Sequence, residues 1–384
     1  MVFDLDGPKI YGMKYMLIAG EASGDLHAAR LIRALRARDA AAEFRFLGGD
    51  EMARAAGREP EIHYADMAFM GLWDVLTHLR AISRNLKRAE NLLETFRPDA
   101  LILVDYPGFN LRLARYAKER GFRVFYYITP KVWAWKEGRI EQLRRYTDRR
   151  FVILPFEPAY FAKHGLEVTY VGNPVKEAID EYRPPDAAEF RRKNALDERP
   201  LVALLPGSRR QEIRHMLPMM MRLADMMPGV QFAIAGAPSL DESVYRRYGW
   251  NERIPLLHGQ TYDLLSVSQA AVVTSGTATL ETALLGVPQV VGYRTVEWQY
   301  RLGKLFVDIE YFSLVNLILN RPAVPELLQG EFNEVRVKNY LEKLLHDTPE
   351  RRQMLADYAD LRKEIGDKRA SEEVAGLIMA FEFV

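Results

Sequence analysis

The chain has 384 residues, of which 48% are hydrophobic, and its 53 Lys and Arg residues nearly balance 52 Asp and Glu residues. This length suggests two domains of roughly 150 residues each, with enough apolar content for large cores. The near-zero net charge argues against a dedicated nucleic-acid-binding protein. The absence of cysteine excludes disulfides, thiolate catalysis and Cys-ligated zinc. Because no apolar run approaches about 18 residues and no signal segment is evident, we expect a cytoplasmic protein that does not span a membrane.

The first predicted strand covers residues 15–19 and leads into the loop Gly20-Glu-Ala-Ser-Gly-Asp25, which precedes an amphipathic helix. Residues 1–12 are expected to be an extension ahead of this strand, since a second methionine follows them. A glycine-containing loop at the carboxyl end of a parallel strand lines the ligand crevice of doubly wound folds. It is also an ordinary turn in which Ser23 or Asp25 caps the helix, and the residues leave both interpretations open.

Residues 67–82 form an unusually apolar connection. Its large apolar side chains share one helical face and comprise Phe69, Leu72, Trp73, Leu76 and Leu79. The basic residues that follow are Arg80, Arg84, Lys87 and Arg88. An apolar face bordered by cations is typical of a helix that lies on an anionic membrane surface. The pattern is also typical of a helix packed against a sheet.

Residues 100–104 predict a buried strand that ends at Asp105 and is followed by Tyr106-Pro-Gly-Phe-Asn110. A helix at 111–119 and a strand at 122–128 come next. An Asp at the carboxyl end of a parallel strand faces the ligand crevice and is a candidate general base. The alternative is a helix cap or turn residue, which are common roles for Asp.

Two tryptophans, Trp133 and Trp135, follow the strand at 122–128 and lie among Lys131, Lys136 and Arg139. This combination suits an aromatic and cationic wall beside a sugar or a phosphate. Packing between domains is the alternative that the residues leave open.

The buried strand at 201–205 opens the second domain, and residues 176–200 predict an interdomain connection with a surface helix. The four residues after the strand are Pro-Gly-Ser-Arg. Gly207 permits close backbone approach, Ser208 offers a hydroxyl, and Arg209 offers a planar fork that matches phosphate oxygens. The alternative is a capped turn with solvated arginines.

The helix behind this loop is rich in methionine and includes Met216 and Met220. Methionine adapts to irregular apolar surfaces, such as acyl chains, and it also fills protein cores. The pattern therefore leaves membrane contact and core packing open.

Residues 271–291 predict a strand, a tight Ser275-Gly-Thr turn, a helix ended by Gly286, and another strand. A helix N-terminus after such a turn presents unpaired backbone N–H groups and a positive dipole end to a phosphate. Glu281 in this helix could accept hydrogen bonds from a ribose diol. An ordinary βαβ unit with a stabilising acid is the alternative.

Both halves alternate strands with helices, which predicts an α/β fold with doubly wound parallel sheets. The remaining predicted strands cover residues 151–154, 168–171, 230–235 and 254–257. The charged and periodic region 325–380 is predicted to be helical. The expected domains are residues 13–175, residues 200–345, and C-terminal helices at 346–384 that pack back on them.

Taken in order, these motifs resemble the lipid-A-disaccharide synthases, inverting glycosyltransferases with two facing Rossmann-like domains in the glycosyltransferase B architecture. The matching motifs are Ala19-Gly-Glu-Ala-Ser-Gly-Asp25, Val104-Asp-Tyr-Pro-Gly-Phe-Asn110, Tyr127-Ile-Thr-Pro-Lys-Val-Trp-Ala-Trp135, Leu205-Pro-Gly-Ser-Arg209, Ser275-Gly-Thr-Ala-Thr-Leu-Glu281, Val291-Gly-Tyr-Arg294 and Ser313-Leu-Val-Asn316. The chain departs from the family at residues 172–174, which are Gly-Asn-Pro where many members carry Gly-His-Thr or Gly-His-Pro. No histidine role can be assigned there.

The resemblance implies that UDP-2,3-diacylglucosamine and 2,3-diacylglucosamine 1-phosphate (lipid X) condense to a β-1,6-linked disaccharide 1-phosphate, with release of UDP. It implies no cofactor and no obligatory metal. Asp105 would be the base, and Arg209 would meet charge on the leaving UDP. The expected donor-binding set is Gly207, Ser208, Arg209, Ser275, Gly276, Thr277, Ala278, Thr279, Glu281 and Asn316. The expected acceptor-side set is Glu21, Ser23, Asp25, Trp133 and Trp135.

Because such acylated substrates reside in a bilayer, the resemblance also favours a peripheral location on the inner face of the bacterial inner membrane. The expected contact residues are Phe69, Leu72, Trp73, Leu76, Met216 and Met220. No nucleic-acid partner is expected, and a homodimer is left open. The alternatives are a UDP-N-acetylglucosamine epimerase-like isomerase, another UDP-sugar glycosyltransferase, or a non-enzymatic UDP-sugar sensor.

Overall fold

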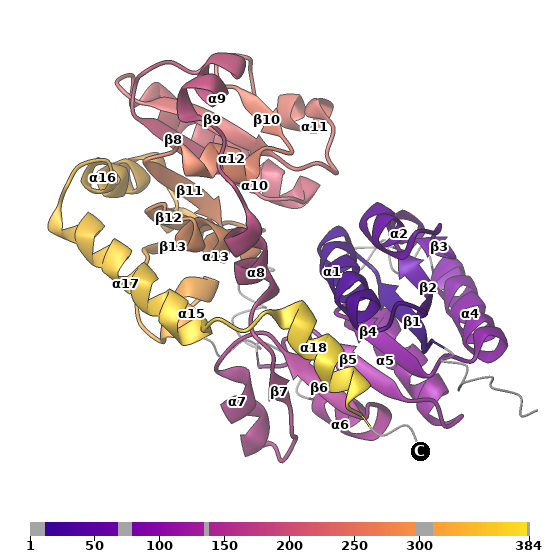
Figure 1. Cartoon of the computed structure of the whole chain (residues 1–384). Coiled ribbons are helices and arrows are strands. Elements are labelled where there is room, and N and C mark those ends of the chain that lie inside the picture. The colour runs from indigo at the N-terminus through magenta and orange to yellow at the C-terminus, as the bar shows by residue number, and fades with distance from the viewer. Residues whose placement is uncertain (1–11, 68–78, 134–137, 297–309, 382–384) are drawn as a thin grey trace, which may run out of the picture. The chain divides into compact units, whose positions relative to one another are not determined.

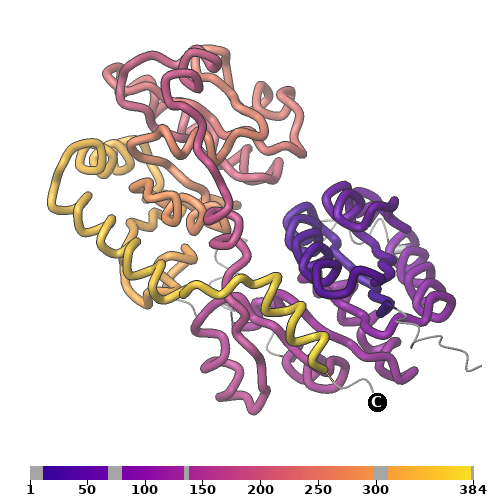
Figure 2. The backbone as a smooth tube through the Cα atoms, in the orientation of Figure 1, coloured from indigo at the N-terminus to yellow at the C-terminus, as the bar shows by residue number. Residues whose placement is uncertain are grey.

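A computed structural model describes residues 12–67, 79–133, 138–296 and 310–381. The chain forms two compact units (Figure 1), each built on its own sheet. Unit 1 comprises Met1–Pro174 and Asp367–Val384, and unit 2 comprises Val175–Gly366. The chain therefore leaves unit 1 once, runs through the whole of unit 2, and returns for its last helix (Figure 2).

In the described residues, unit 1 has a seven-stranded parallel sheet of order β3-β2-β1-β4-β5-β6-β7. The strands are β1 (Lys14–Ala19), β2 (Glu43–Gly48), β3 (Ile62–His63), β4 (Ala100–Val104), β5 (Val124–Tyr127), β6 (Arg149–Val152) and β7 (Thr169–Tyr170). The helices are α1 (Ala22–Arg38), α2 (Asp50–Ala56), the 3-10 turn η1 (Tyr64–Asp66), α4 (Leu79–Phe96), α5 (Pro107–Lys118), α6 (Arg139–Tyr146), α7 (Glu157–Lys163) and α18 (Ala370–Met379).

The central strand β1 of unit 1 is buried on both faces, because its successive side chains alternate between two apolar cores. Tyr15 and Leu17 join the core beneath α1, α2 and α18. Met16 and Ile18 join the core beneath α4, α5 and α6. The last helix, α18, packs along α1, although more than 300 residues separate the two in sequence (Figure 1). Helices on both faces of a parallel sheet confirm the predicted doubly wound class.

Unit 2 has a six-stranded parallel sheet of order β10-β9-β8-β11-β12-β13 in its described part. The strands are β8 (Leu201–Leu205), β9 (Gln231–Gly236), β10 (Leu256–His258), β11 (Ala270–Thr274), β12 (Gln289–Tyr293) and β13 (Glu326–Leu328). The helices are α8 (Pro174–Glu181, which begins at the unit boundary), α9 (Ala187–Lys193), α10 (Arg210–Asp225), α11 (Glu242–Arg247), α12 (Thr261–Ser266), α13 (Thr277–Leu284), α15 (Leu314–Leu319), the 3-10 turn η2 (Gln329–Glu331), α16 (Glu334–Leu344) and α17 (Pro349–Ile365).

The strand order reverses once in each sheet, between β1 and β4 in unit 1 and between β8 and β11 in unit 2. Where the strand order reverses, the connections after the two neighbouring strands run in opposite directions and leave a crevice between them. Open parallel sheets bind ligands in this crevice, outside the carboxyl ends of the strands. The loops after β1, β4, β8 and β11 therefore lie where each unit is expected to hold a ligand.

The prediction that the helical C-terminal region begins at residue 325 is wrong, because Glu326–Leu328 form the edge strand β13. The strand pairs with β12, and the Glu326 carboxylate accepts hydrogen bonds from the Phe312 and Ser313 N–H groups at 2.8 and 2.7 Å. These partners are distant in sequence, so local periodicity does not reveal them. Strands β2 and β3 were not predicted either, and continuous helix begins only at Glu334.

Candidate functional site

In unit 1, the loops that follow β1 and β4 are in direct contact. A Cβ atom at Gly20 would lie 2.2 Å from Cδ1 of Tyr106, so glycine is required where the two loops meet. The Tyr106 hydroxyl donates to the Met67 carbonyl at 2.6 Å. Burial, with a contribution from Glu21, raises the pKa of Tyr106 to about 12, so this hydroxyl stays protonated and remains a donor.

Asp105 lies at the end of β4 in a strained backbone conformation. Its N–H donates to the Tyr127 carbonyl at 3.0 Å and thereby extends the pairing of β4 with β5 by one residue. The chain then turns sharply, with φ of 46° at both Asp105 and Tyr106. Left-handed conformations of non-glycine residues cost about 1–3 kcal/mol each and cluster at functional sites. The half-buried carboxylate of Asp105 therefore lies on a turn that the surrounding fold enforces.

Two residues predicted to line the acceptor side, Glu21 and Ser23, lie at the start of α1. Glu21 is the half-buried N-cap residue and accepts a hydrogen bond from the Asp25 N–H through its carbonyl oxygen at 2.9 Å. Ser23 is exposed in the first helical turn. Both lie at the carboxyl edge of the unit 1 sheet, next to the loop after β4. Their contact with a ligand stays a prediction.

The side chain of Asp25 is 3% exposed and is used inside unit 1, and a ligand contact of this residue stays a prediction. Its carboxylate accepts hydrogen bonds from the N–H groups of Gly49 (2.7 Å), Glu51 (3.0 Å) and Met52 (3.2 Å). These donors form the start of α2, whose first N–H groups lack partners within the helix. Asp25 thus caps a helix that the sequence analysis did not predict.

Trp133 is anchored inside unit 1, whereas Trp135 lies outside the described residues. The Trp133 indole N–H donates to Glu157 Oε1 at 3.1 Å, and the ring meets Phe156 edge-on. Glu157 is buried and also accepts hydrogen bonds from its own preceding loop. Burial raises the pKa of Glu157 to about 7, against the lowering effect of these hydrogen bonds. That Trp133 and Trp135 line a sugar or phosphate site stays a prediction.

In unit 2, the loop after β8 is closed around the carboxylate of Glu212 in α10. Glu212 Oε2 accepts the N–H of Ser208 at 2.8 Å and that of Arg209 at 3.3 Å. Gly207 has φ of 110°, and a Cβ atom there would lie 2.3 Å from the same oxygen. The backbone amides of this loop therefore already hold an anion. The Arg209 guanidinium is more than half exposed and lies 3.9 Å from Glu212 Oε1. A phosphate contact of this side chain stays a prediction.

In the loop after β11, three exposed or half-exposed residues, Gly276, Thr277 and Ala278, lead into α13. The amides of Thr277 and Ala278 belong to the first helical turn, where backbone N–H groups have no acceptor within the helix. The Ser275 hydroxyl donates to the Phe312 carbonyl at 2.7 Å. The side chain of Thr279 is 0% exposed, and both its N–H and its hydroxyl donate to the Gly276 carbonyl. A ligand contact of Thr279 stays a prediction.

A contact of Asn316 with the donor stays a prediction, and the structure gives its amide a role within unit 2. Asn316 is buried, and its Nδ2 donates to the Val324 carbonyl and to Glu326 Oε1, both at 2.9 Å. Its Oδ1 accepts the Val324 N–H at 2.9 Å. The amide thus holds Glu326, which binds the backbone of residues 312–313 behind Ser275. Asn316 supports the loop after β11 from within the core.

Glu281 of α13 has one partner that the sequence analysis missed. The Tyr262 hydroxyl, from α12, donates to Glu281 Oε1 at 2.8 Å. The Tyr262 ring meets Tyr182 edge-on at 5.5 Å, and the Tyr182 hydroxyl donates to Asp263 Oδ1 at 2.7 Å. Burial raises the pKa of Glu281, and the hydrogen bond from Tyr262 opposes that rise. No local pattern links these residues, because α12 and α13 meet only in the fold.

The predicted membrane contacts at Met216 and Met220 are wrong, because both side chains are 0% exposed. They lie on α10, which packs against β11 and α16 within unit 2. The methionines therefore fill an irregular core, which was the alternative interpretation. The other predicted contacts, Phe69, Leu72, Trp73 and Leu76, lie outside the described residues.

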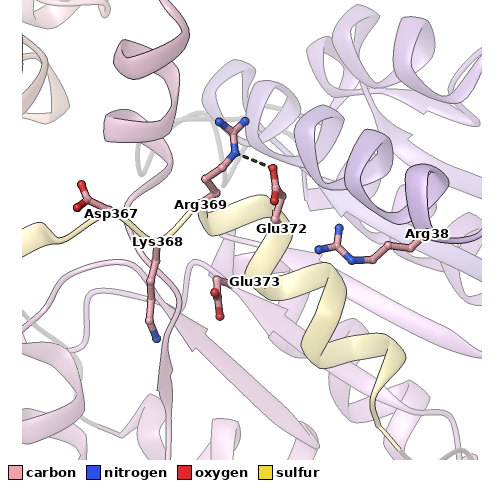
Figure 3. A pocket seen from close by; sticks show the side chains of 6 residues that line it. All are labelled: Arg38, Asp367, Lys368, Arg369, Glu372 and Glu373. Carbon is pink, nitrogen blue, oxygen red and sulfur yellow. Dashed lines mark ion pairs between the residues drawn. The ribbon is translucent and has the colours of Figure 1, made fainter.

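A hollow of about 490 Å³ in unit 1 holds none of the predicted site residues (Figure 3). It is lined by Arg38, Asp367, Lys368, Arg369, Glu372 and Glu373. Three cations and three anions line it, and Arg369 pairs with Glu372 at 2.7 Å, so the hollow has no excess of positive charge to attract a diphosphate. Within the described ranges, no group of three or more acidic or histidine side chains could hold a metal ion.

Residues 15–380 match the protein family described as lipid-A-disaccharide synthetase. The chain belongs to this family. The lipid-A-disaccharide synthase of Syntrophus aciditrophicus (strain SB) is 37% identical over 376 residues, which cover 96% of this chain and 97% of the relative. That of Myxococcus xanthus (strain DK1622) is 38% identical and covers 95% of this chain and 97% of its own length. Membership confirms the predicted enzyme class, a glycosyltransferase of lipid A biosynthesis.

Solved structures share the fold of this synthase family at low sequence identity. The UDP-GlcNAc 2-epimerase of Neisseria meningitidis, bound to UDP-GlcNAc, aligns with a TM-score of 0.65 over 96% of this chain and 100% of that chain, at 15% identity. Anabaena HepE, in complex with UDP and glucose, aligns with a TM-score of 0.59 over 96% and 100% of the two chains, at 12% identity. These likenesses confirm the predicted glycosyltransferase B-like fold. Because the synthases are more than twice as similar in sequence, the epimerase alternative is not favoured.

The assignment of Asp25 as a cap predicts a structural effect of its replacement. In Asp25→Asn, the amide group turns a donor toward N–H groups, and we expect α2 to lose about 1–3 kcal/mol of local stability. Hydrogen exchange of residues 49–56 should then be roughly 5- to 150-fold faster. The exposed neighbour Ser23→Ala is the control and should leave exchange unchanged. Unchanged exchange in Asp25→Asn together with impaired turnover would indicate a direct role in substrate binding.

Proposed function

We propose that this chain transfers the 2,3-diacylglucosaminyl group of UDP-2,3-diacylglucosamine to the 6-hydroxyl of 2,3-diacylglucosamine 1-phosphate. The products are a β-1,6-linked disaccharide 1-phosphate and UDP, and the anomeric configuration is inverted. The observation that carries the proposal is family membership across nearly the whole chain. The proposal is also supported by the two places where the strand order of a sheet reverses. Asp105 lies at this place in unit 1, and Arg209 and the start of α13 lie at it in unit 2.

Asp105 is the proposed general base of the transfer. The acceptor O6 attacks the anomeric carbon of the donor from the face opposite UDP. As the new C–O bond forms, the bond between the anomeric carbon and the phosphate oxygen breaks, and its electron pair leaves with UDP. The hydroxyl proton passes to the Asp105 carboxylate. The enforced turn at Asp105 supports this role, because it fixes the position of the base before the substrate binds.

Two features of unit 2 are proposed to stabilise the leaving UDP. The Arg209 guanidinium supplies positive charge for the diphosphate, and the amides of Thr277 and Ala278 supply donors at the positive end of α13. Glu281 would then accept hydrogen bonds from the ribose hydroxyls. Neighbours of the same fold were solved with UDP-GlcNAc or with UDP and glucose, which supports a UDP-sugar as the donor of this chain.

The decisive experiment is an assay with both acylated substrates, scored by disaccharide formation, in the parent protein and in Asp105→Asn. We expect Asp105→Asn to lose about 100-fold or more in kcat, because an amide cannot take the proton. Its affinity for UDP should be unchanged, since UDP is assigned to unit 2. Asp50→Asn removes an exposed carboxylate from the same sheet edge and should retain full turnover. Rapid turnover by Asp105→Asn would exclude this base, and epimerisation of UDP-GlcNAc without disaccharide formation would support the epimerase alternative.

Replacement of Tyr262 by Phe tests the proposed ribose contact of Glu281. Loss of the donated hydrogen bond should weaken UDP binding by roughly 3- to 10-fold. It should also raise the pKa of Glu281 further, because that hydrogen bond lowers it in the parent. A protonated Glu281 is a poorer acceptor for a diol, so UDP affinity should decrease as the pH is lowered. In the variant, this decrease should begin at a higher pH than in the parent. Calorimetric titration with UDP across the mildly acidic to neutral range measures both effects.

The matched control for this prediction is Tyr182→Phe. It removes a hydroxyl from the partner ring, but that hydroxyl bonds Asp263 rather than Glu281. We expect little change in UDP affinity and no shift in its pH dependence. An equal loss in the two variants would mean that the aromatic pair acts through packing and not through Glu281.

We further propose that unit 1 binds the anionic membrane surface that holds the acylated substrates, on the inner face of the inner membrane. No helix in the described part of the chain is long and apolar enough to cross a membrane. One exposed face of α4 carries four cations around a shallow hollow of about 460 Å³. The residues lining it are Arg80, Ser83, Arg84, Lys87, Arg88 and Asn91. Their spacing of three to four residues gives a continuous basic strip, which suits lipid phosphates.

Charge reversal on this strip tests membrane binding. The double variant Arg84→Glu, Lys87→Glu should bind vesicles containing phosphatidylglycerol at least about tenfold more weakly, because each cation near such a surface contributes about 1 kcal/mol. The double variant Arg33→Glu, Lys163→Glu changes the net charge equally at exposed sites outside α4 and should bind like the parent. Cosedimentation with anionic and with neutral vesicles measures the difference. Equal binding by both double variants would contradict the proposal.

A further inference from the structure

We infer that Tyr126 and Asn110 are positioning residues, which hold the peptide carbonyl of Asp105 and thereby aim its carboxylate. The inference rests on the proposed role of Asp105 as general base. The Tyr126 hydroxyl donates to the Asp105 carbonyl at 2.6 Å, and Asn110 Nδ2 donates to the same oxygen at 2.8 Å. Two donors from different elements, β5 and α5, thus converge on one backbone oxygen.

The double contact matters because this carbonyl belongs to a strained residue. With φ of 46°, Asp105 is in the left-handed region, and an unrestrained Asp at the end of a strand would favour an extended conformation. Rotation to an extended conformation would swing the carbonyl away from both donors and redirect the side chain. The two hydrogen bonds therefore oppose the relaxation that would move the base.

Both positioning residues are fully buried, which makes their hydrogen bonds costly to break. Burial raises the pKa of Tyr126 well above its usual value, so its hydroxyl is a permanent donor. Asn110 Nδ2 also contacts the Val104 carbonyl at 3.3 Å, so one amide group binds the last residue of β4 and the first residue of the turn. Neither side chain belongs to the proposed base or to the donor-binding groups of unit 2.

The next residue, Tyr106, is restrained independently. Its ring packs against Gly20, and its hydroxyl bonds the Met67 carbonyl. Loss of the Tyr126 or Asn110 contact should therefore leave the loops after β1 and β4 together while it loosens Asp105 alone. This separation allows a local test that leaves the rest of the fold intact.

Tyr126→Phe is the primary test, because it deletes one hydroxyl and keeps the ring in the core. We expect kcat for disaccharide formation to fall by roughly 10- to 100-fold, as misplacement of a reacting group does. KM and the affinity and stoichiometry of UDP binding should stay within about twofold of the parent values. The matched control is Tyr15→Phe, another fully buried tyrosine of the same sheet, whose hydroxyl contacts Met13 Sδ at the opposite strand end. It should retain the parent kcat.

Asn110→Ser is the second variant and removes the other donor, with the same expected selective loss in kcat. The inference is overturned if either variant, with the circular dichroism spectrum and melting temperature of the parent, keeps the parent kcat. It is also overturned if Tyr15→Phe loses as much as Tyr126→Phe, since the loss would then reflect the core in general. If Asp105→Asn is itself active, the proposed base is wrong. If Asp105→Asn is inactive while Tyr126→Phe is normal, the base stands and only the positioning role fails.

Discussion

Parallel strand pairing is the constraint on which the rest of this structure depends. Because all paired strands in both sheets run in the same direction, every strand of a unit ends at one edge, and the loops that follow are brought together there. The reversal of strand order then selects two of these loops in each unit. Asp105 in unit 1, and Arg209 with the start of α13 in unit 2, occupy those selected positions. The chemistry proposed for the chain follows from this geometry and not from any single motif.

Loops at a sheet edge lose the backbone partners that strands provide, and this protein replaces them with carboxylates. Asp25 binds three N–H groups at the start of α2, and Glu212 binds two in the loop after β8. Glu326 binds the backbone behind Ser275, and Glu157 binds its own preceding loop. Each of these acids keeps a loop in shape through hydrogen bonds from backbone N–H groups. Pre-organised catalysis requires a fixed loop, because no conformational entropy is then lost in ordering the reacting groups during the reaction.

Sequence patterns located the loops of the candidate site better than they assigned the roles of individual residues. Continuous apolar runs predicted β4 and β8 with the bounds that the structure has, and they thereby located Asp105 and Arg209. Short or polar edge strands such as β3 and β13 carry no such run and were missed. Asp25, Thr279 and Asn316 have side chains suited to a ligand, but the fold buries them, so their polar atoms bind protein groups. Residue type indicates what a side chain can bind, whereas burial decides whether a ligand can reach it.

The sequence by itself determined the fold class, the family and the order of the loops that carry the chemistry, because these depend on local apolar patterns and on motifs that are contiguous in the chain. Only the tertiary structure decided which polar groups meet. The contacts of Tyr262 with Glu281, of Glu326 with the backbone behind Ser275, and of Tyr126 with the Asp105 carbonyl join separate elements. They also span 14 to 21 residues, beyond any local period. The physical reason is that hydrogen bonds of this kind depend on how strands and helices pack. The spacing of residues along the chain does not give the distance between two elements in the folded protein.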